Sequence, residues 1–244
     1  MRTPALTTNA ESAHIDTTRS TSTVSADITA VLKFSHQEKT CCDCLSRERC
    51  PVSRQMSAEP GRQAVVVSGS QVLEQGEHMF QENHAAEALY IVKSGSAKVY
   101  FTSEDGSEQV VAFYMPGDVL GLDALGVKRH ASSALALEST SVCVIPFAAL
   151  EEACANLSAS GWHQCLYKLL SRELNRDHLT MELITKKDAE AKMAGFMLYL
   201  SGQFRERGYS ASSFNLSMKR SEIGSYLGLA VETVSRILSR FQED

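Results

Sequence analysis

CLYKLLSRELNRDHLTMELI, residues 165–184, has the periodicity of one long amphipathic helix. Its apolar residues recur at steps of three and four if Asp177 is counted as the missing member of the series: Leu166, Leu170, Leu174, Met181 and Ile184. This spacing is typical of a seam that packs against another helix. A second apolar set, Leu169, Leu179 and Leu183, is expected to face the helix's own domain.

Asp177 is the unusual member of the seam. If the seam packs against its own copy across a two-fold axis, two carboxylates meet in a poorly solvated place and weaken the dimer when both are ionised. Such a dimer can be switched between the associated and the dissociated state. The alternative that the spacing leaves open is an amphipathic core helix with Asp177 on its solvated edge.

Composition places the chain among globular proteins. It has 244 residues, of which 43% are hydrophobic and 22% charged, and this is long enough for one or two domains. No apolar run approaches the length of a membrane span and no export signal is recognisable, so we expect a cytoplasmic protein. The net charge of −5 argues against indiscriminate nucleic-acid binding but leaves room for a local basic face.

Cysteines crowd near the start of the chain, after a Thr- and Ser-rich segment over residues 1–38 that we expect to be a disordered arm. Cys41 and Cys44 form a Cys-x-x-Cys pair, and Cys50 follows six residues later. Three thiolates in ten positions predict a metal site completed by a distant fourth ligand, either tetrahedral zinc or an iron–sulfur cluster. Spacing does not choose between the two, and a metal-free surface loop is the remaining alternative.

Between residues 65 and 147 the pattern changes to short β runs separated by turn residues. Runs at 89–92 (LYIV), 98–101 (KVYF) and 110–113 (VVAF) recur at the spacing of an all-β roll or sandwich. Asp105-Gly106 predicts a hairpin turn between the last two of these runs. The run 141–146 (SVCVIP) is expected to close the sheet and to place Cys143 in a strand.

The C-terminal part predicts a helix over 188–207 followed by a helix-turn-helix. Two short apolar-periodic segments within 221–238 meet at Gly228. On the second, Glu232, Ser235 and Arg236 lie on the face opposite its apolar side. Arginine can donate two hydrogen bonds to guanine, glutamate can accept one from cytosine, and serine suits several base edges in the major groove. The alternative is a Glu–Arg pair on a solvated helix, but the preceding turn favours DNA reading.

Taken in order, these segments resemble the CRP/FNR superfamily of bacterial transcription regulators, and specifically its oxygen-sensing, Anr-like FNR branch. The stretches that carry the resemblance are Cys-x2-Cys-x5-Cys at 41–50, EQVVAF at 108–113 with PGDVLG at 116–121, SVCVIPF at 141–147 and IGSYLGLAVETVSR at 223–236. The resemblance covers roughly residues 40–244. It implies an α+β fold: an N-terminal double-stranded β-helix (a cyclic-nucleotide-binding-like β-roll), a long dimerisation helix and a C-terminal winged-helix-type helix-turn-helix.

The implied boundaries are a disordered arm at 1–38, the cysteine loop and β-roll at 39–159, the dimerisation helix at 160–186 and the DNA-binding domain at 187–244. The family continues past the recognition helix into a β-hairpin wing. This sequence ends at Asp244, so we expect the wing to be missing.

The resemblance also implies a mechanism. Cys41, Cys44, Cys50 and Cys143 would be the ligands of a [4Fe-4S] cluster that oxygen converts to a [2Fe-2S] form. The intact cluster would favour a homodimer, with Asp177 and Leu174 at the dimer switch. The remaining cysteines fall outside the family's ligand pattern and are expected to be bystanders: Cys42, Cys154 and Cys165.

Further partners are implied in the same way. Glu232, Ser235 and Arg236 would read double-stranded DNA at palindromes of TTGAT-like half-sites, and the β-roll would contact RNA polymerase. Cyclic-AMP-type relatives hold the cyclic phosphate with a Gly-Glu-Leu segment followed by arginine. This chain has Gly-Leu-Asp at 121–123 and His130 instead, so we expect that it binds no cyclic nucleotide.

Two alternatives from other functional classes stay open at this point. One is a zinc-stabilised DNA-binding protein of the same fold that does not respond to oxygen. The other is a metal-dependent, cupin-like enzyme built on the β-roll. The histidines of that region, His78, His84 and His130, are scattered among turn signals and are expected to be isolated surface residues, so we expect no enzyme and no catalytic residues.

Overall fold

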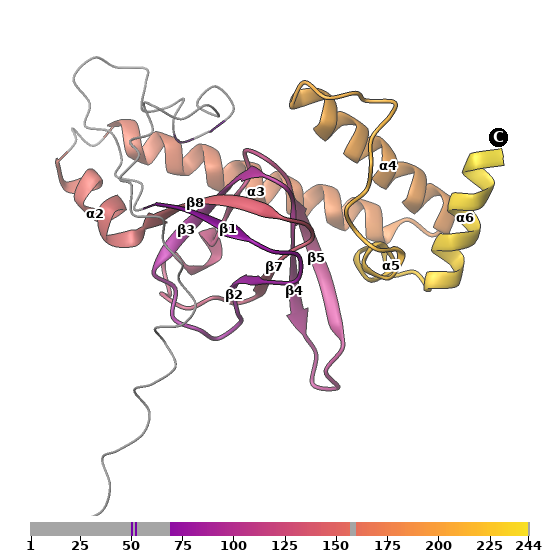
Figure 1. Ribbon diagram of the computed structural model, residues 1–244, viewed down its shortest axis with the longest axis horizontal. Coiled ribbons are helices and arrows are strands. Elements are labelled where there is room, and N and C mark those ends of the chain that lie inside the picture. The colour runs from indigo at the N-terminus through magenta and orange to yellow at the C-terminus, as the bar shows by residue number, and fades with distance from the viewer. Residues whose placement is uncertain (1–49, 51, 53–68, 157–159, 244) are drawn as a thin grey trace, which may run out of the picture. The chain divides into compact units, whose positions relative to one another are not determined.

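The computed structural model describes residues 50, 52, 69–156 and 160–243, and Figure 1 shows the elements they form. The strands are β1 (Gly69–Leu73), β2 (His78–Phe80), β3 (Ala88–Ser94), β4 (Ala97–Thr102), β5 (Glu108–Tyr114), β6 (Val119–Leu120), β7 (Ser133–Ala136) and β8 (Thr140–Pro146). A short 3-10 helix, η2 (Leu122–Ala124), follows β6. The α-helices are α2 (Phe147–Asn156), α3 (Ser160–Thr185), α4 (Ala189–Glu206), α5 (Arg220–Leu227) and α6 (Val231–Glu243). The predicted strands, the long helix and the helix-turn-helix are therefore confirmed.

The strands form two four-stranded antiparallel sheets in the orders β1-β8-β3-β6 and β2-β7-β4-β5. Strand β8 pairs with both β1 and β3, which confirms that residues 141–146 close the first sheet and that Cys143 lies in a strand. The predicted hairpin joins β4 to β5, and Gly106 adopts the left-handed conformation (φ 82°) that its turn requires. The chain up to residue 49, which includes the expected arm and Cys41 and Cys44, lies outside the described residues.

Strand β3 shows how one strand serves two cores. Ala88 and Val92 point into the core between the two sheets, whereas Leu89 and Ile91 point to the outer face, because successive side chains of a strand alternate between its faces. On that outer face they pack with residues of α2 and α3 in a second cluster, which we call the α3 cluster: Cys50, Val52, Ala86, Leu89, Ile91, Val119, Leu122, Ala124, Ile145, Phe147, Leu150, Cys165 and Leu169, with Cys143, Leu125 and Leu166 at its border.

A third cluster joins strands β4 and β5 to the helix-turn-helix. Phe113 of β5 packs against Phe196 of α4 and Tyr226 of α5, with ring centroids 6.0 and 5.2 Å away. Tyr226 also shares a 2.9 Å hydrogen bond with Thr180 of α3. Helices α4 and α5 and the roll therefore share one apolar core, since these side chains are buried together.

Polar contacts supplement this core along β5. Ser225 of α5 accepts a hydrogen bond from the Val110 N–H and donates one to the Glu108 carbonyl, each 2.9 Å long. Lys98 is buried, and its ammonium lies 2.5 Å from a Glu108 oxygen and 3.1 Å from a Glu222 oxygen. A buried ammonium requires such partners because desolvation without them is costly.

Helix α3 has the predicted apolar stripe, although its faces differ from expectation in one respect. Leu169 and Leu183 are buried as predicted, but Leu179 is 46% exposed, so its assignment to the helix's own core was wrong. Position 179 lies beside the cleft between α3 and α4 instead of beneath the roll. None of the described helices is both long and apolar enough to cross a membrane.

Candidate functional site

Helix α6, which carries the three residues that the sequence predicts to read bases, follows α5 after a tight turn. Gly228 ends α5 in the left-handed conformation (φ 64°), and its N–H donates to the Gly224 carbonyl. Gly224 is needed for a different reason: a Cβ at this position would lie 2.6 Å from the Leu229 carbonyl oxygen. A side chain at position 224 would collide with that oxygen. Glycine therefore allows the backbone of α5 to approach the Leu229 carbonyl closely, and this contact orients α6.

Helix α6 buries one face and exposes the other. Val234 and Ile237 are buried in the core shared with α4 and α5. Glu232 and Arg236 are exposed and Ser235 is partly exposed. The three residues that the sequence predicts to read bases therefore lie on an accessible face of one helix, which is the geometry that major-groove reading requires.

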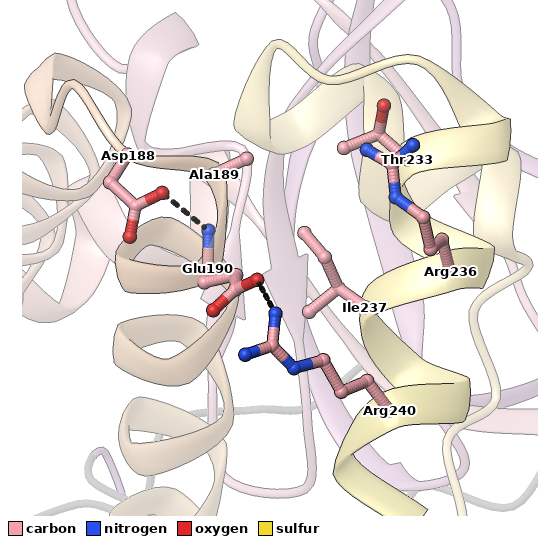
Figure 2. Close-up of a pocket in the computed structure, with 7 residues that line it drawn as sticks. All are labelled: Asp188, Ala189, Glu190, Thr233, Arg236, Ile237 and Arg240. Carbon is pink, nitrogen blue, oxygen red and sulfur yellow. Dashed lines mark hydrogen bonds and ion pairs between the residues drawn. The ribbon is translucent and has the colours of Figure 1, made fainter.

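A second arginine on α6 has a structural partner. Figure 2 shows Arg240 reaching Glu190 in the first turn of α4, with 2.5 Å between the guanidinium nitrogen and the carboxylate oxygen, whereas Arg236 points away from Glu190. Asp188 caps the same end of α4 by accepting hydrogen bonds from the N–H groups of Glu190 and Ala191. Arg240 thus ties α6 to α4, whereas the exposed Arg236 makes no ion pair with Glu190 and lies beside Thr233.

Two of the predicted ligands, Cys50 and Cys143, come together in the α3 cluster although they are far apart in the sequence. Cys41 and Cys44 lie outside the described residues, and the part of the chain that is described contains no group of three metal-ligating side chains. Cysteine residues in one apolar region are compatible with an iron–sulfur centre, since such clusters are held by cysteine thiolates. The described residues therefore include two of the four cysteines that the sequence predicts as ligands.

Cys165 is the residue at this site that the sequence did not indicate. It lies at the start of α3, is 2% exposed, and belongs to the same cluster as Cys50. Burial, together with a smaller effect of the neighbouring Cys50, raises the pKa of the Cys165 thiol to about 11 against the opposing effects of Lys168 and Arg172. The apolar spacing of residues 165–184 does not indicate that Cys165 lies near Cys50. Cys42 and the side chain of Cys154 lie outside the described residues.

The outward face of α3 carries the predicted seam. Leu174 and Met181 are 56% and 60% exposed, Leu170 is also exposed, and Asp177 lies exposed between them. Leu166 instead packs at the border of the α3 cluster. Exposed apolar side chains gathered along one helix mark a surface suited to association.

The turn after β6 contains the segment at 121–131 that replaces the Gly-Glu-Leu and arginine sequence expected of cyclic-AMP-type relatives. Asp123 of η2 accepts a 3.0 Å hydrogen bond from the Ala131 N–H, and its other oxygen lies 3.9 Å from His130 Nδ1. His130 is 2% exposed and stacks on Phe80 with a centroid distance of 3.8 Å. The expectation of a surface position was therefore wrong for His130: the turn folds its imidazole inward over Phe80, which single-residue spacing does not reveal.

Comparisons with known proteins agree with this architecture. Residues 70–156 match the cyclic nucleotide-binding domain family, and residues 216–244 match the family of bacterial regulatory proteins called the crp family. The chain is similar to the transcriptional activator protein Anr of Pseudomonas protegens, with 40% identity over 211 residues that cover 86% of this chain and 85% of that protein. It is similar to the fumarate and nitrate reduction regulatory protein of Vibrio cholerae, with 36% identity over 203 residues that cover 83% and 80%.

Among solved structures, FixK2 from Bradyrhizobium japonicum is similar with a TM-score of 0.59 and 30% identity, covering 71% of this chain and 84% of that chain. The regulator TTHB099 from Thermus thermophilus, at 18% identity and a TM-score of 0.57, shares the fold. Because two of the relatives exceed 35% identity over most of both chains, the chain belongs to the CRP/FNR family of bacterial regulators, on the FNR branch, and is a DNA-binding transcription regulator and not an enzyme.

Proposed function

We propose that this protein is an oxygen-responsive transcription regulator. A [4Fe-4S] cluster held by Cys41, Cys44, Cys50 and Cys143 would control dimerisation, and the dimer would bind palindromic TTGAT-like half-sites at promoters of anaerobic or microaerobic metabolism. One observation carries the proposal. Cys165 and Leu169 of helix α3 pack in the apolar cluster that contains Cys50 and has Cys143 at its border, and the same helix exposes the apolar seam interrupted by Asp177.

The cysteines and the seam lie on one continuous element. When bound, the cluster would supply an oxygen-reactive group at the cysteines. Cys165 and Leu169 of α3 pack in the same apolar cluster as Cys50, so any rearrangement of Cys50 changes the surface on which the start of α3 rests. A helix is stiff over its length, and a change at its first turns therefore alters the placement of the seam relative to a partner.

Opposing free energies make the seam suitable for a switch. Full burial of one leucine or methionine side chain is worth about 1.5–3 kcal/mol, so Leu170, Leu174 and Met181 favour association. Two ionised Asp177 carboxylates that meet at about 4 Å repel each other by about 4 kcal/mol at an effective dielectric constant near 20. The repulsion is as large as the burial of one or two of these side chains, so its presence or absence shifts the monomer–dimer equilibrium strongly.

We assign recognition of the DNA half-site to α6. Its accessible Glu232, Ser235 and Arg236 would contact the bases. We further propose that the β-roll contacts RNA polymerase and that the protein acts in the cytoplasm, where promoters are found. The turn at 121–131 supports the proposal that no cyclic nucleotide binds. Asp123 already pairs with the Ala131 N–H and faces His130, so its carboxylate is engaged within the turn.

Binding to a TTGAT palindrome, measured by fluorescence anisotropy on anaerobic protein and again after exposure to air, tests the proposal. Tight binding that is lost in air is expected, together with a change from dimer to monomer. Equal affinity before and after aeration would contradict oxygen control, although DNA binding itself would stand.

Replacing Glu232 with Ala is expected to relax discrimination at one base pair of each half-site. The lost side-chain contact to a base is worth about 1–3 kcal/mol, which corresponds to roughly 5- to 150-fold in relative affinity. Competition binding with half-sites substituted at each position measures the effect. Glu243→Ala, which makes the same charge change in the exposed last turn of α6, serves as the control. A uniform loss of affinity for all sequences would indicate misfolding or a phosphate effect instead.

A further inference from the structure

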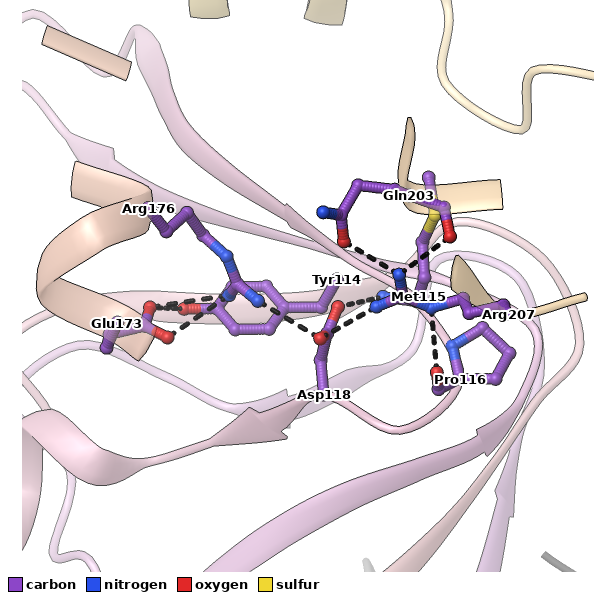
Figure 3. A network of polar contacts seen from close by, with 8 residues as sticks. All are labelled: Tyr114, Met115, Pro116, Asp118, Glu173, Arg176, Gln203 and Arg207. Atoms are coloured by element: carbon purple, nitrogen blue, oxygen red, sulfur yellow. Dashed lines mark hydrogen bonds and ion pairs between the residues drawn. The ribbon is translucent and has the colours of Figure 1, made fainter. Parts of the chain in front are cut away.

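Asp118 joins three parts of the chain through one carboxylate (Figure 3). It lies in the turn between β5 and β6, where its Oδ2 accepts a 2.8 Å hydrogen bond from the Met115 N–H. Its Oδ1 is 3.1 Å from Arg176 Nη2 of α3 and 2.8 Å from Arg207 Nη2 at the end of α4. A single oxygen of the roll thus holds one arginine from the proposed dimer helix and one from the DNA-binding domain.

On the α3 side, Arg176 is firmly placed. Its side chain is 13% exposed, its Nη1 lies 3.2 Å from a Glu173 oxygen, and its guanidinium lies 4.3 Å from the centre of the Tyr114 ring. Burial by itself lowers the pKa of Arg176, but Asp118 and Glu173 outweigh that effect and raise the pKa, so the group is always charged. Arg176 directly precedes Asp177, the residue assigned to the dimer switch.

On the α4 side, Arg207 is equally constrained. Its side chain is 11% exposed, its Nε donates to the Pro116 carbonyl at 2.9 Å, and its Nη1 donates to Gln203 Oε1 at 2.7 Å. Helix α4 is in turn fixed to the reading helix through Arg240 and Glu190 and through their shared apolar core. Rotation of α4 about the roll therefore carries α6 with it.

The apolar and polar parts of this junction have different physical roles. Packing of Phe113, Phe196 and Tyr226 holds the DNA-binding helices against the roll, but apolar attraction is non-directional and permits small rotations. Charge-assisted hydrogen bonds are directional and geometrically specific. The Asp118 contacts lie on the side of the junction where α3 and α4 meet, so they fix the angle between these helices.

We propose that Asp118 is a positioning residue that sets the half-site spacing the dimer accepts, by fixing the angle between the dimer helix and the reading helix. This inference rests on the proposed function, since it requires a dimer on a palindrome. In B-DNA one added base pair separates two half-sites by about 3.4 Å more and turns one by about 34° relative to the other, because a turn holds about 10.5 base pairs. A rigid connection between α3 and α6 rejects such a change, whereas a loosened one accommodates it.

The test compares the wild-type chain with Asp118→Asn, both anaerobic and cluster-loaded, on palindromes whose spacers differ by one base pair. The wild-type protein is expected to lose at least about tenfold in affinity when the best spacer is lengthened or shortened, because half-site spacing is a geometric constraint. For Asp118→Asn we expect the affinity to fall by less than about threefold when the spacer is changed by one base pair. The variant should still sediment as a dimer and should keep its discrimination between single bases within a half-site. Arg207→Gln, which breaks the contact from the other side, is expected to relax the spacing preference in the same way.

Asp105→Asn is the matched control. Asp105 is an exposed carboxylate of the β4–β5 turn, and its side chain accepts hydrogen bonds from the N–H and hydroxyl of Ser107. It should keep the wild-type spacing profile. A wild-type protein that binds as a monomer or ignores spacing would contradict the proposed function. A spacing-dependent wild type whose Asp118→Asn and Arg207→Gln variants keep the same profile, or weaken equally on all spacers, would overturn the inference alone. If Asp118→Asn does not fold, the dependence of DNA affinity on spacer length in Arg207→Gln tests the inference instead.

Discussion

Replacing Asp177 with Ala is expected to give a protein that remains a dimer in air. The substitution removes two carboxylates that face each other in the proposed seam and leaves Leu174 and Met181 to pack across it. Relief of about 2–4 kcal/mol of repulsion strengthens the dimer about 30- to 1,000-fold, since each 1.4 kcal/mol is a factor of ten. The aerated variant should therefore also retain DNA binding that the aerated wild type loses.

Sedimentation of aerated protein across a range of concentrations measures this effect. Glu182→Ala is the appropriate control, because Glu182 is an exposed carboxylate of the same helix that pairs with Lys186 at 3.8 Å and lies off the seam. It should leave the aerated protein monomeric. An Asp177→Ala protein that stays monomeric in air would remove Asp177 from the switch and would favour the interpretation of α3 as a core helix with a solvated edge.

Replacing Cys143 with Ser is expected to abolish the cluster and, with it, dimerisation and DNA binding in anaerobic protein. The substitution keeps a small side chain in β8 but replaces the thiolate that iron–sulfur clusters require. Iron content should fall from about four per chain to a small fraction of that. Thermal unfolding of the cluster-free proteins shows whether the β-roll itself is intact.

Cys165→Ala is the sharpest control for this experiment, because Cys165 is a buried cysteine of the same apolar cluster that is not one of the expected ligands. It should keep its iron and its visible absorbance. Loss of iron in Cys165→Ala together with retention in Cys143→Ser would mean that α3 supplies the fourth ligand. The assignment of Cys143 would then be wrong.

Local patterns in the sequence were sufficient for most of the fold. The hairpin at Asp105 and Gly106, the strand that contains Cys143 and the turn at Gly228 all follow from residue types whose conformational preferences act over a few positions. The long helix also follows from its period. These features depend on neighbours in the sequence, and this is why they were predictable.

Features that depend on distant neighbours were not predictable in this way. Leu179 and Leu183 share one apolar series, but only Leu183 meets the core of the DNA-binding helices. His130 is buried because the turn folds it onto Phe80, and Asp118 acquires its role only when α3 and α4 meet the same turn. In each case the partner lies on another element of the fold, so a helical or strand period contains no information about it.

The most direct measurement for the central claim is iron, acid-labile sulfide and visible absorbance of anaerobically purified protein, repeated on the same sample after air is admitted. The proposal predicts a brown protein with about four irons and four sulfides per chain that bleaches in air and changes from dimer to monomer. Colourless protein that holds one zinc per chain under both conditions would contradict oxygen sensing. The DNA-binding fold would remain, and the cysteines at 41–50 would then belong to a structural zinc site.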